Sequence, residues 1–137
     1  MYMPTRTARA ALPQISERGG QLVFIASVYS FANGLLASPY AASKAALIGL
    51  MRSAALETVT DGITVNAVQP GNVRTAGLAH IDPELLAAVE RSIPIGRLAE
   101  PDEVGWVVRF FASDEAAYVT GQSLVIDGGQ VLPEAAG

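Results

Sequence analysis

The architecture of this chain is set by two short apolar runs, Gln21-Leu-Val-Phe-Ile-Ala-Ser27 and Ile63-Thr-Val-Asn-Ala-Val68. Their apolar residues follow one another instead of alternating with polar ones. Such runs are typical of strands that are covered on both faces, as in a parallel sheet between layers of helices. Ser27 and the loop Gln69-Pro70-Gly71 come at the carboxyl ends of these strands. Open α/β sheets bind their ligands at that edge.

Helical patterns and a third strand surround the two runs. Ser38 is expected to cap the longest helix, with Pro39 at its first position. The alternation of strands and helices predicts one α/β domain, residues 1–137, with a parallel sheet. The expected helices are 4–17, Tyr40 to about Val59, Asp82-Pro83 to Arg91 and a helix from Pro101, and the third strand is Ser123–Asp127.

Composition excludes several classes of function. The net charge of -4 lacks the basic excess that a phosphate backbone requires, so nucleic acid is not an expected partner. No segment has the roughly 20 apolar residues needed to span a bilayer, so no membrane association is expected. The chain has no cysteine, which rules out disulfides and is simplest to understand in a reducing, cytoplasmic setting. Half of the residues are hydrophobic, a balance that fits a soluble oligomer.

Tyr40 and Lys44 form the first candidate for chemistry. They are four residues apart in an expected helix, so both side chains project from one face. A free phenol ionises near pH 10, so acid–base work near neutrality needs a cation that favours the phenolate. Lys44 is the only lysine, and it lies in the most apolar helix, where an unpaired charge is costly. Ser27 could approach Tyr40 across the intervening loop and donate a hydrogen bond to a substrate carbonyl oxygen.

An ordered set of motifs resembles the short-chain dehydrogenase/reductase family over essentially the whole chain. The resemblance implies the C-terminal half of a doubly wound, Rossmann-type parallel sheet, with about three strands and flanking helices. The motifs are Gly20-Gln-Leu-Val-Phe-Ile-Ala-Ser27, Tyr40-Ala-Ala-Ser-Lys44, Asn66-Ala-Val-Gln-Pro70-Gly71, Ile95-Gly-Arg-Leu-Ala-Glu-Pro101, Phe110-Phe-Ala-Ser-Asp114 and Thr120-Gly-Gln-Ser-Leu-Val-Ile-Asp-Gly-Gly129.

The resemblance also implies roles for the three candidates. Tyr40 would be the general acid/base, Lys44 would assist it and hydrogen-bond the nicotinamide ribose, and Ser27 would hold the reacting oxygen. The implied activity is NAD- or NADP-dependent hydride transfer on an alcohol or ketone. The choice between the two cofactors stays open. The identity of the substrate also stays open, because the lid at about 76–94 is the variable part of the family. The family also implies a homo-oligomer, a dimer or tetramer.

The loop after the second strand is the implied contact for the cofactor. In the family, this segment grips the nicotinamide carboxamide, with the Val73 backbone and the Thr75 hydroxyl as expected contacts beside Pro70 and Gly71. Pro70 and Gly71 also suit a simple turn. His80 and Arg74 are interpreted as solvated surface residues, and Trp106 as part of the core or of an interface.

One family signature has no counterpart in the sequence. The Thr-Gly-x-x-x-Gly-x-Gly loop, whose glycines let a helix N-terminus approach the pyrophosphate, does not occur. The expectation is therefore a truncated chain that lacks the dinucleotide-binding half and is inactive by itself. Two alternatives remain: a short, non-catalytic paralogue acting as an assembly or interaction subunit, and a chain that completes its sheet by pairing with another.

Overall fold

The computed structural model describes residues 2–15, 19–32 and 34–132. Three parallel strands form one sheet in the order β1-β2-β3, with β1 at Gly20–Ile25, β2 at Ile63–Pro70 and β3 at Ser123–Ile126. The register pairs Gly20 with Ile63 and Ala67 with Ser123. The predicted α/β class and parallel sheet are confirmed, and all three strands fall where their apolar runs predicted them.

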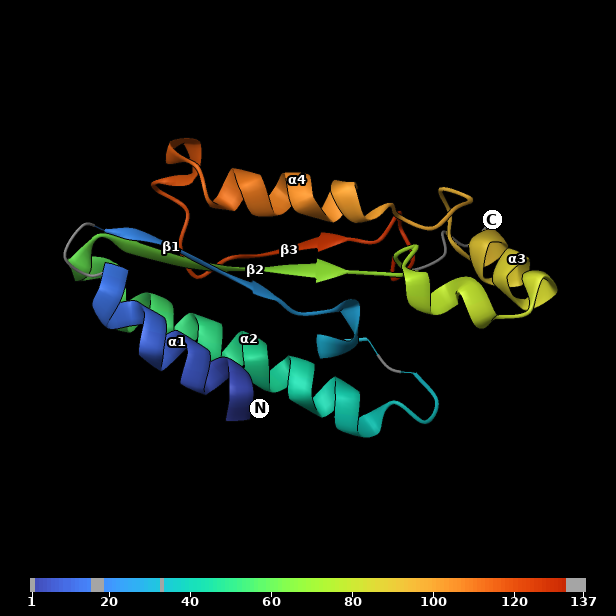
Figure 1. Cartoon of the computed structure of the whole chain (residues 1–137), viewed down its shortest axis with the longest axis horizontal. Coiled ribbons are helices and arrows are strands. Elements are labelled where there is room, and N and C mark those ends of the chain that lie inside the picture. Colours follow the sequence, from blue (N-terminus) through green and yellow to red (C-terminus); the bar gives the residue numbers. More distant parts are fainter. Residues whose placement is uncertain (1, 16–18, 33, 133–137) are drawn as a thin grey trace.

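The helices form a layer on each face of the sheet (Figure 1). Helices α1 (Tyr2–Ile15) and α2 (Ser38–Thr58) lie together on one face, and α4 (Pro101–Phe111) covers the other. Helix α3 (Pro83–Ser92) lies beyond the carboxyl ends of the strands, away from both layers. The sheet is therefore enclosed by helices, while the edge that receives ligands in such folds faces α3.

Burial separates the central strand from its neighbours. Seven of the eight residues of β2 are buried, as its continuous apolar run predicted for a strand covered on both faces. The same prediction holds only in part for β1, which is an edge strand whose last residue, Ile25, is 45% exposed. An edge strand has a neighbour on one side alone, so its apolar pattern does not guarantee full burial.

The core lies between the sheet and the pair α1 and α2. Met51 of α2 is completely buried there, together with Val65 and Ala67 of β2 and Ala8 of α1. Helix α2 does not bury all of its apolar residues within this chain, because Leu56 is 81% exposed. Trp106 of α4 is 65% exposed, so its interpretation as a core residue is wrong within this chain.

Helix starts follow local rules that the sequence displays. Asp82 accepts a hydrogen bond from the Glu84 backbone N–H at 2.9 Å and caps α3, as its position before Pro83 predicted. Pro39 lies in the first turn of α2, as expected. The prediction that Ser38 caps this helix is wrong by one residue, because the helix begins at Ser38 and Ala37 precedes it without a side-chain cap. Over the described ranges, no helix is long and apolar enough to cross a membrane.

Candidate active site

Ser27 lies two residues beyond the end of β1 and is buried, with 6% of its surface exposed. It is the N-cap of a short 3-10 helix, η1 (Val28–Ser30), and its Oγ accepts a hydrogen bond from the Tyr29 backbone N–H at 3.3 Å. Serine suits this position because its hydroxyl satisfies a backbone donor at a helix start. The hydroxyl proton takes no part in that bond and can be donated elsewhere.

Tyr40 and Lys44 lie one turn apart near the start of α2. The Lys44 Nζ atom is 5.5 Å from the centroid of the Tyr40 ring, within the range of cation–π attraction. The same ammonium donates a hydrogen bond to the Ile25 carbonyl oxygen at 2.9 Å, which ties α2 to the last residue of β1. Tyr40 is 49% exposed, so a small molecule has access to it.

Tyr29 is a neighbour of this pair that sequence reasoning missed. Its ring meets the Tyr40 ring edge-on, with 5.8 Å between centroids and an interplanar angle of 76°. A Cβ on Gly34 would come within 2.3 Å of the Tyr29 ring, so a larger residue there would displace that ring. No local pattern predicts this contact, because it depends on the path of the loop between β1 and α2.

The three predicted catalytic side chains therefore gather around the carboxyl end of β1. Ser27 leads directly into η1, the ring of Tyr29 in η1 contacts Tyr40, and Lys44 contacts both Tyr40 and β1. The arrangement offers a hydroxyl, a phenol and an ammonium at one edge of a sheet. Those groups can hold a carbonyl or alcohol oxygen and exchange a proton with it.

The predicted cofactor loop begins where β2 ends, beside the carboxyl end of β3. The Gly71 N–H donates to the Ile126 carbonyl at 2.9 Å, and a Cβ on Gly71 would lie only 2.8 Å from the Asp127 Cβ. Gly71 thus serves close packing between two chain segments. The turn interpretation is wrong for Pro70, which is the last residue of β2 and pairs with Ile126. Val73 then pairs with Ala99 in an isolated parallel bridge. Thr75 is exposed and precedes the 3-10 helix η3 (Ala76–His80).

Arg74 is exposed, as expected of a surface residue, and it also takes part in two ion pairs. Its guanidinium contacts Glu90 of α3 at 2.5 Å and Glu100, the residue before α4, at 3.1 Å. The hydrogen bonds that Arg74 donates to these two carboxylates, with that to Glu90 the larger cause, raise the pKa of Arg74 above its ordinary value. The sequence contains no local signal for this pairing, because the three residues are far apart in the chain. His80 is exposed, as expected.

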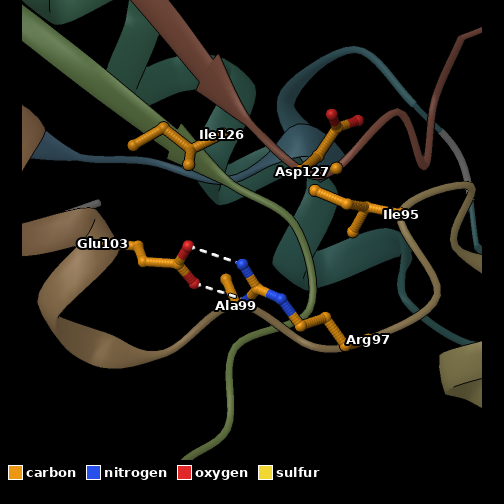
Figure 2. A pocket seen from close by; sticks show the side chains of 7 residues that line it. Ile95, Arg97, Ala99, Glu103, Ile126 and Asp127 are labelled. Carbon is orange, nitrogen blue, oxygen red and sulfur yellow. Dashed lines mark hydrogen bonds and ion pairs between the residues drawn. The ribbon is translucent and has the colours of Figure 1, made fainter.

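A small cavity of about 130 Å³ opens beside the end of β3 (Figure 2). Arg97 and Glu103 face each other across it in a two-pronged ion pair at 2.7 and 2.8 Å. This pair, with a backbone hydrogen bond from Glu100, lowers the pKa of Glu103 to about 2. Both carboxylate oxygens of Asp127 accept backbone N–H groups, from Gly129 and Val131. The two bonds to Asp127 hold the turn after β3.

The sequence of this chain is similar to those of known enzymes. A family model described as enoyl-(acyl carrier protein) reductase matches residues 1–130. The chain belongs to the short-chain dehydrogenase/reductase family. A relative from Sinorhizobium fredii, described as an uncharacterized short-chain type dehydrogenase/reductase, is 41% identical over 85% of this chain and 22% of its own length. The resemblance expected from the motifs is thereby confirmed.

Two further similarities place the chain within the family. Oxidoreductase UcpA of Salmonella typhimurium is 44% identical, over 92% of this chain and 52% of that protein. A 3-oxoacyl-[acyl-carrier protein] reductase from Brucella melitensis is 34% identical with a TM-score of 0.88, covering 94% of this chain and 49% of that one. The chain therefore spans about half the length of these relatives. Its sheet corresponds to part of their Rossmann-type sheet, as the resemblance implied.

A second solved structure with this fold contains a bound cofactor. Gluconate 5-dehydrogenase from Burkholderia cenocepacia, solved in complex with NADP and tartrate, is 28% identical with a TM-score of 0.86. It is matched over 93% of this chain and 51% of that one.

Proposed function

We propose that this chain carries the reacting end of an NAD(P)-dependent oxidoreductase that interconverts an alcohol and a ketone. The observation that supports it most is the Lys44 ammonium, placed 5.5 Å from the Tyr40 ring at the strand end that also presents Ser27. An ammonium group in a helix that otherwise buries apolar residues is costly in free energy, so its presence there suggests a functional role. A nearby cation that favours the ionised form of the Tyr40 phenol would be such a role.

In the proposed reaction, Tyr40 moves the proton. When an alcohol is oxidised, the Tyr40 phenolate takes the hydroxyl proton while the substrate carbon loses a hydride and becomes a ketone carbon. Lys44 stabilises the phenolate by its charge, and the Ser27 hydroxyl donates a hydrogen bond to the substrate oxygen. The nicotinamide cofactor, when bound, accepts that hydride in oxidation and supplies it in reduction. Both directions use the same three side chains.

The residues at this edge suit the nicotinamide end of the cofactor. Val73 and Thr75 follow the carboxyl end of β2, and Thr75 is exposed where a carboxamide could meet its hydroxyl. Lys44 has donors left after its bond to Ile25, because an ammonium carries three. NAD and NADP share this end of the molecule, so the same contacts serve either cofactor.

We propose that the 137-residue chain by itself does not catalyse this reaction. Family resemblance assigns the pyrophosphate and adenine contacts to the Thr-Gly-x-x-x-Gly-x-Gly loop, which this sequence does not contain.

A second candidate function is a non-catalytic assembly subunit. The exposed Trp106 and Leu56, on helices that cover opposite faces of the sheet, favour association with other chains. The same surfaces support a homo-oligomer of the complete enzyme.

The proposal is tested in this chain joined to the N-terminal half of the UcpA relative. We expect NADH- or NADPH-dependent reduction of small ketones, and Tyr40→Phe should lower kcat at least about a hundredfold, the scale of general acid/base catalysis. Tyr118→Phe is the matched control, since Tyr118 is fully exposed and lies outside the site. Turnover by Tyr40→Phe close to that of the unmodified protein would contradict the assignment and favour the assembly subunit.

A further inference from the structure

Arg74 lies in the middle of the loop that the proposed function assigns to the nicotinamide. Its neighbours in sequence are Val73 and Thr75, the two expected cofactor contacts. Its backbone N–H donates to the Ala99 carbonyl at 2.8 Å, which holds this part of the loop beside the segment leading into α4. The main chain at Arg74 is therefore anchored, and its side chain points to other elements.

The Arg74 guanidinium joins two elements to this loop. Its Nη2 atom contacts Glu90 in the last turn of α3, and its Nε atom contacts Glu100 directly before α4. A planar guanidinium can serve two carboxylates at once because its donors form a rigid fork. One side chain thus links the cofactor loop, the lid helix α3 and the start of α4.

The packing of α3 shows why such a link matters. No residue of α3 is fully buried. An apolar cavity of about 210 Å³ separates the helix from the loop, lined by Val73 and Leu98 on one side and by Leu86 and Val89 of α3 on the other. Side chains beside a cavity lose part of their packing attraction, so apolar contact holds α3 only loosely. The ion pair from Arg74 to Glu90 spans the two sides.

We propose that Arg74 is a positioning residue that fastens the lid helix α3 to the loop 72–75, so that lid and loop keep one relative placement. The inference rests on the proposed function for the role of that loop. Arg74 need not touch the substrate or the cofactor. Arg74 holds the lid through Glu90 and ties the loop to the start of α4 through Glu100. It thereby sets how the lid is placed relative to the loop that is assigned to the cofactor.

The structural part is tested by hydrogen exchange on the 137-residue chain. Arg74→Gln and Glu90→Gln should each speed exchange of the amides at 83–92 by about fivefold, the upper range for a half-exposed ion pair. Amides of α2 at 38–58 should not change. Arg97→Gln is the matched control, because it breaks the ion pair with Glu103 and removes no contact of α3. It should alter exchange at 83–92 by less than about twofold.

The functional part is tested in the joined protein with NADH and with NADPH, and with a panel of small ketones that includes acetoin and cyclohexanone. For the ketone reduced fastest, Arg74→Gln and Glu90→Gln should raise KM several-fold and change kcat by less than about twofold. The double variant should raise KM no further than Arg74→Gln alone, because both changes remove one contact. A purely structural role would lower the amount of folded enzyme and leave KM unchanged.

Two results would overturn the proposal. Exchange at 83–92 that stays within about twofold in both variants would show that the ion pair does not hold α3. Faster exchange with an unchanged KM would show that the ion pair holds α3 without positioning the site. If the unmodified joined protein reduces no ketone in the panel, the proposed function fails instead. The exchange measurement then still decides whether Arg74 fastens α3.

Discussion

Single polar side chains join parts of this molecule that are distant in sequence. Lys44 reaches back to the carbonyl of Ile25, and Arg74 reaches forward to Glu90 and Glu100. Each contact lies at the carboxyl edge of the sheet or beside the lid. The candidate site is thus held by a few directional contacts between elements, in addition to the packing of the core beneath it.

Glu103 offers a direct test of one such contact. Its pKa lies near 2 instead of at the ordinary 4.5, mainly because Arg97 donates to it. A carboxyl-carbon NMR titration of the chain should therefore find a midpoint near 2 for Glu103. In Arg97→Gln, the midpoint should rise toward 4.5, since the largest cause of the shift is gone.

The same shift determines how Glu103 contributes to stability as pH changes. The folded-state pKa is lower than the unfolded one, so the unfolded chain binds more protons between pH 4.5 and 2. The contribution is complete above pH 4.5 and is lost as pH falls toward 2. Urea unfolding across this range should show a weaker acid dependence for Glu103→Gln than for the unmodified chain. Equal dependence would contradict the pairing.

Among the elements, the central strand β2 is joined by side-chain hydrogen bonds to the segment that leads into β3. Its Asn66 is fully buried, donates to the Val119 carbonyl at 2.8 Å and accepts from the Gln122 N–H at 3.0 Å. Thr120 Oγ1 accepts from the Val65 N–H at 3.0 Å. These bonds pin the segment before β3 to β2, and so place β3 in its parallel register.

Removing the Asn66 amide should destabilise the fold strongly. Asn66→Ala leaves the part-buried Val119 carbonyl and Gln122 N–H without their partner, at a cost of about 2 kcal/mol in the free energy of unfolding. The matched control is Thr64→Val on the same strand. The buried hydroxyl of Thr64 has no hydrogen-bond partner among the described residues, so its loss should be neutral or slightly stabilising. Urea denaturation measures both, and similar effects would refute the argument.

Considered as a whole, the molecule leaves large apolar side chains exposed on α2 and α4. The joined protein should therefore be a dimer or tetramer by light scattering, and Trp106→Glu should lower its mass. Ala88→Glu, which adds the same charge on exposed α3, should leave the mass unchanged. A monomer at micromolar concentration would contradict the prediction.

Cofactor affinity of the 137 residues is the second expectation for the whole molecule. Micromolar binding of a dinucleotide corresponds to about 8 kcal/mol, and several lost charge-assisted hydrogen bonds at roughly 1.5 to 3 kcal/mol each leave a millimolar dissociation constant or weaker. Calorimetric titration with NADH and NADPH measures it. A dissociation constant below about 100 μM, roughly 5.5 kcal/mol, would show that the chain builds a complete site in another way, such as by pairing with a second copy.

Local patterns were enough to predict the elements of this protein and the family to which it belongs. Continuous apolar runs marked β1 and β2, and Asp82 before Pro83 marked the start of α3. These features depend on neighbours within a few residues, so the sequence displays them directly. The Tyr40 and Lys44 pair was visible for the same reason, since one helical turn brings them together.

The tertiary structure alone decided which distant groups meet. The bond from Lys44 to Ile25, the contact of Tyr29 with Tyr40 and the bridge from Arg74 to Glu90 and Glu100 join segments that no periodicity relates. The burial of apolar side chains also depends on the tertiary structure. An apolar pattern shows that burying a face is favourable, but only the packed arrangement shows what covers that face. Trp106 and Ile25 stay exposed because no described element packs over them.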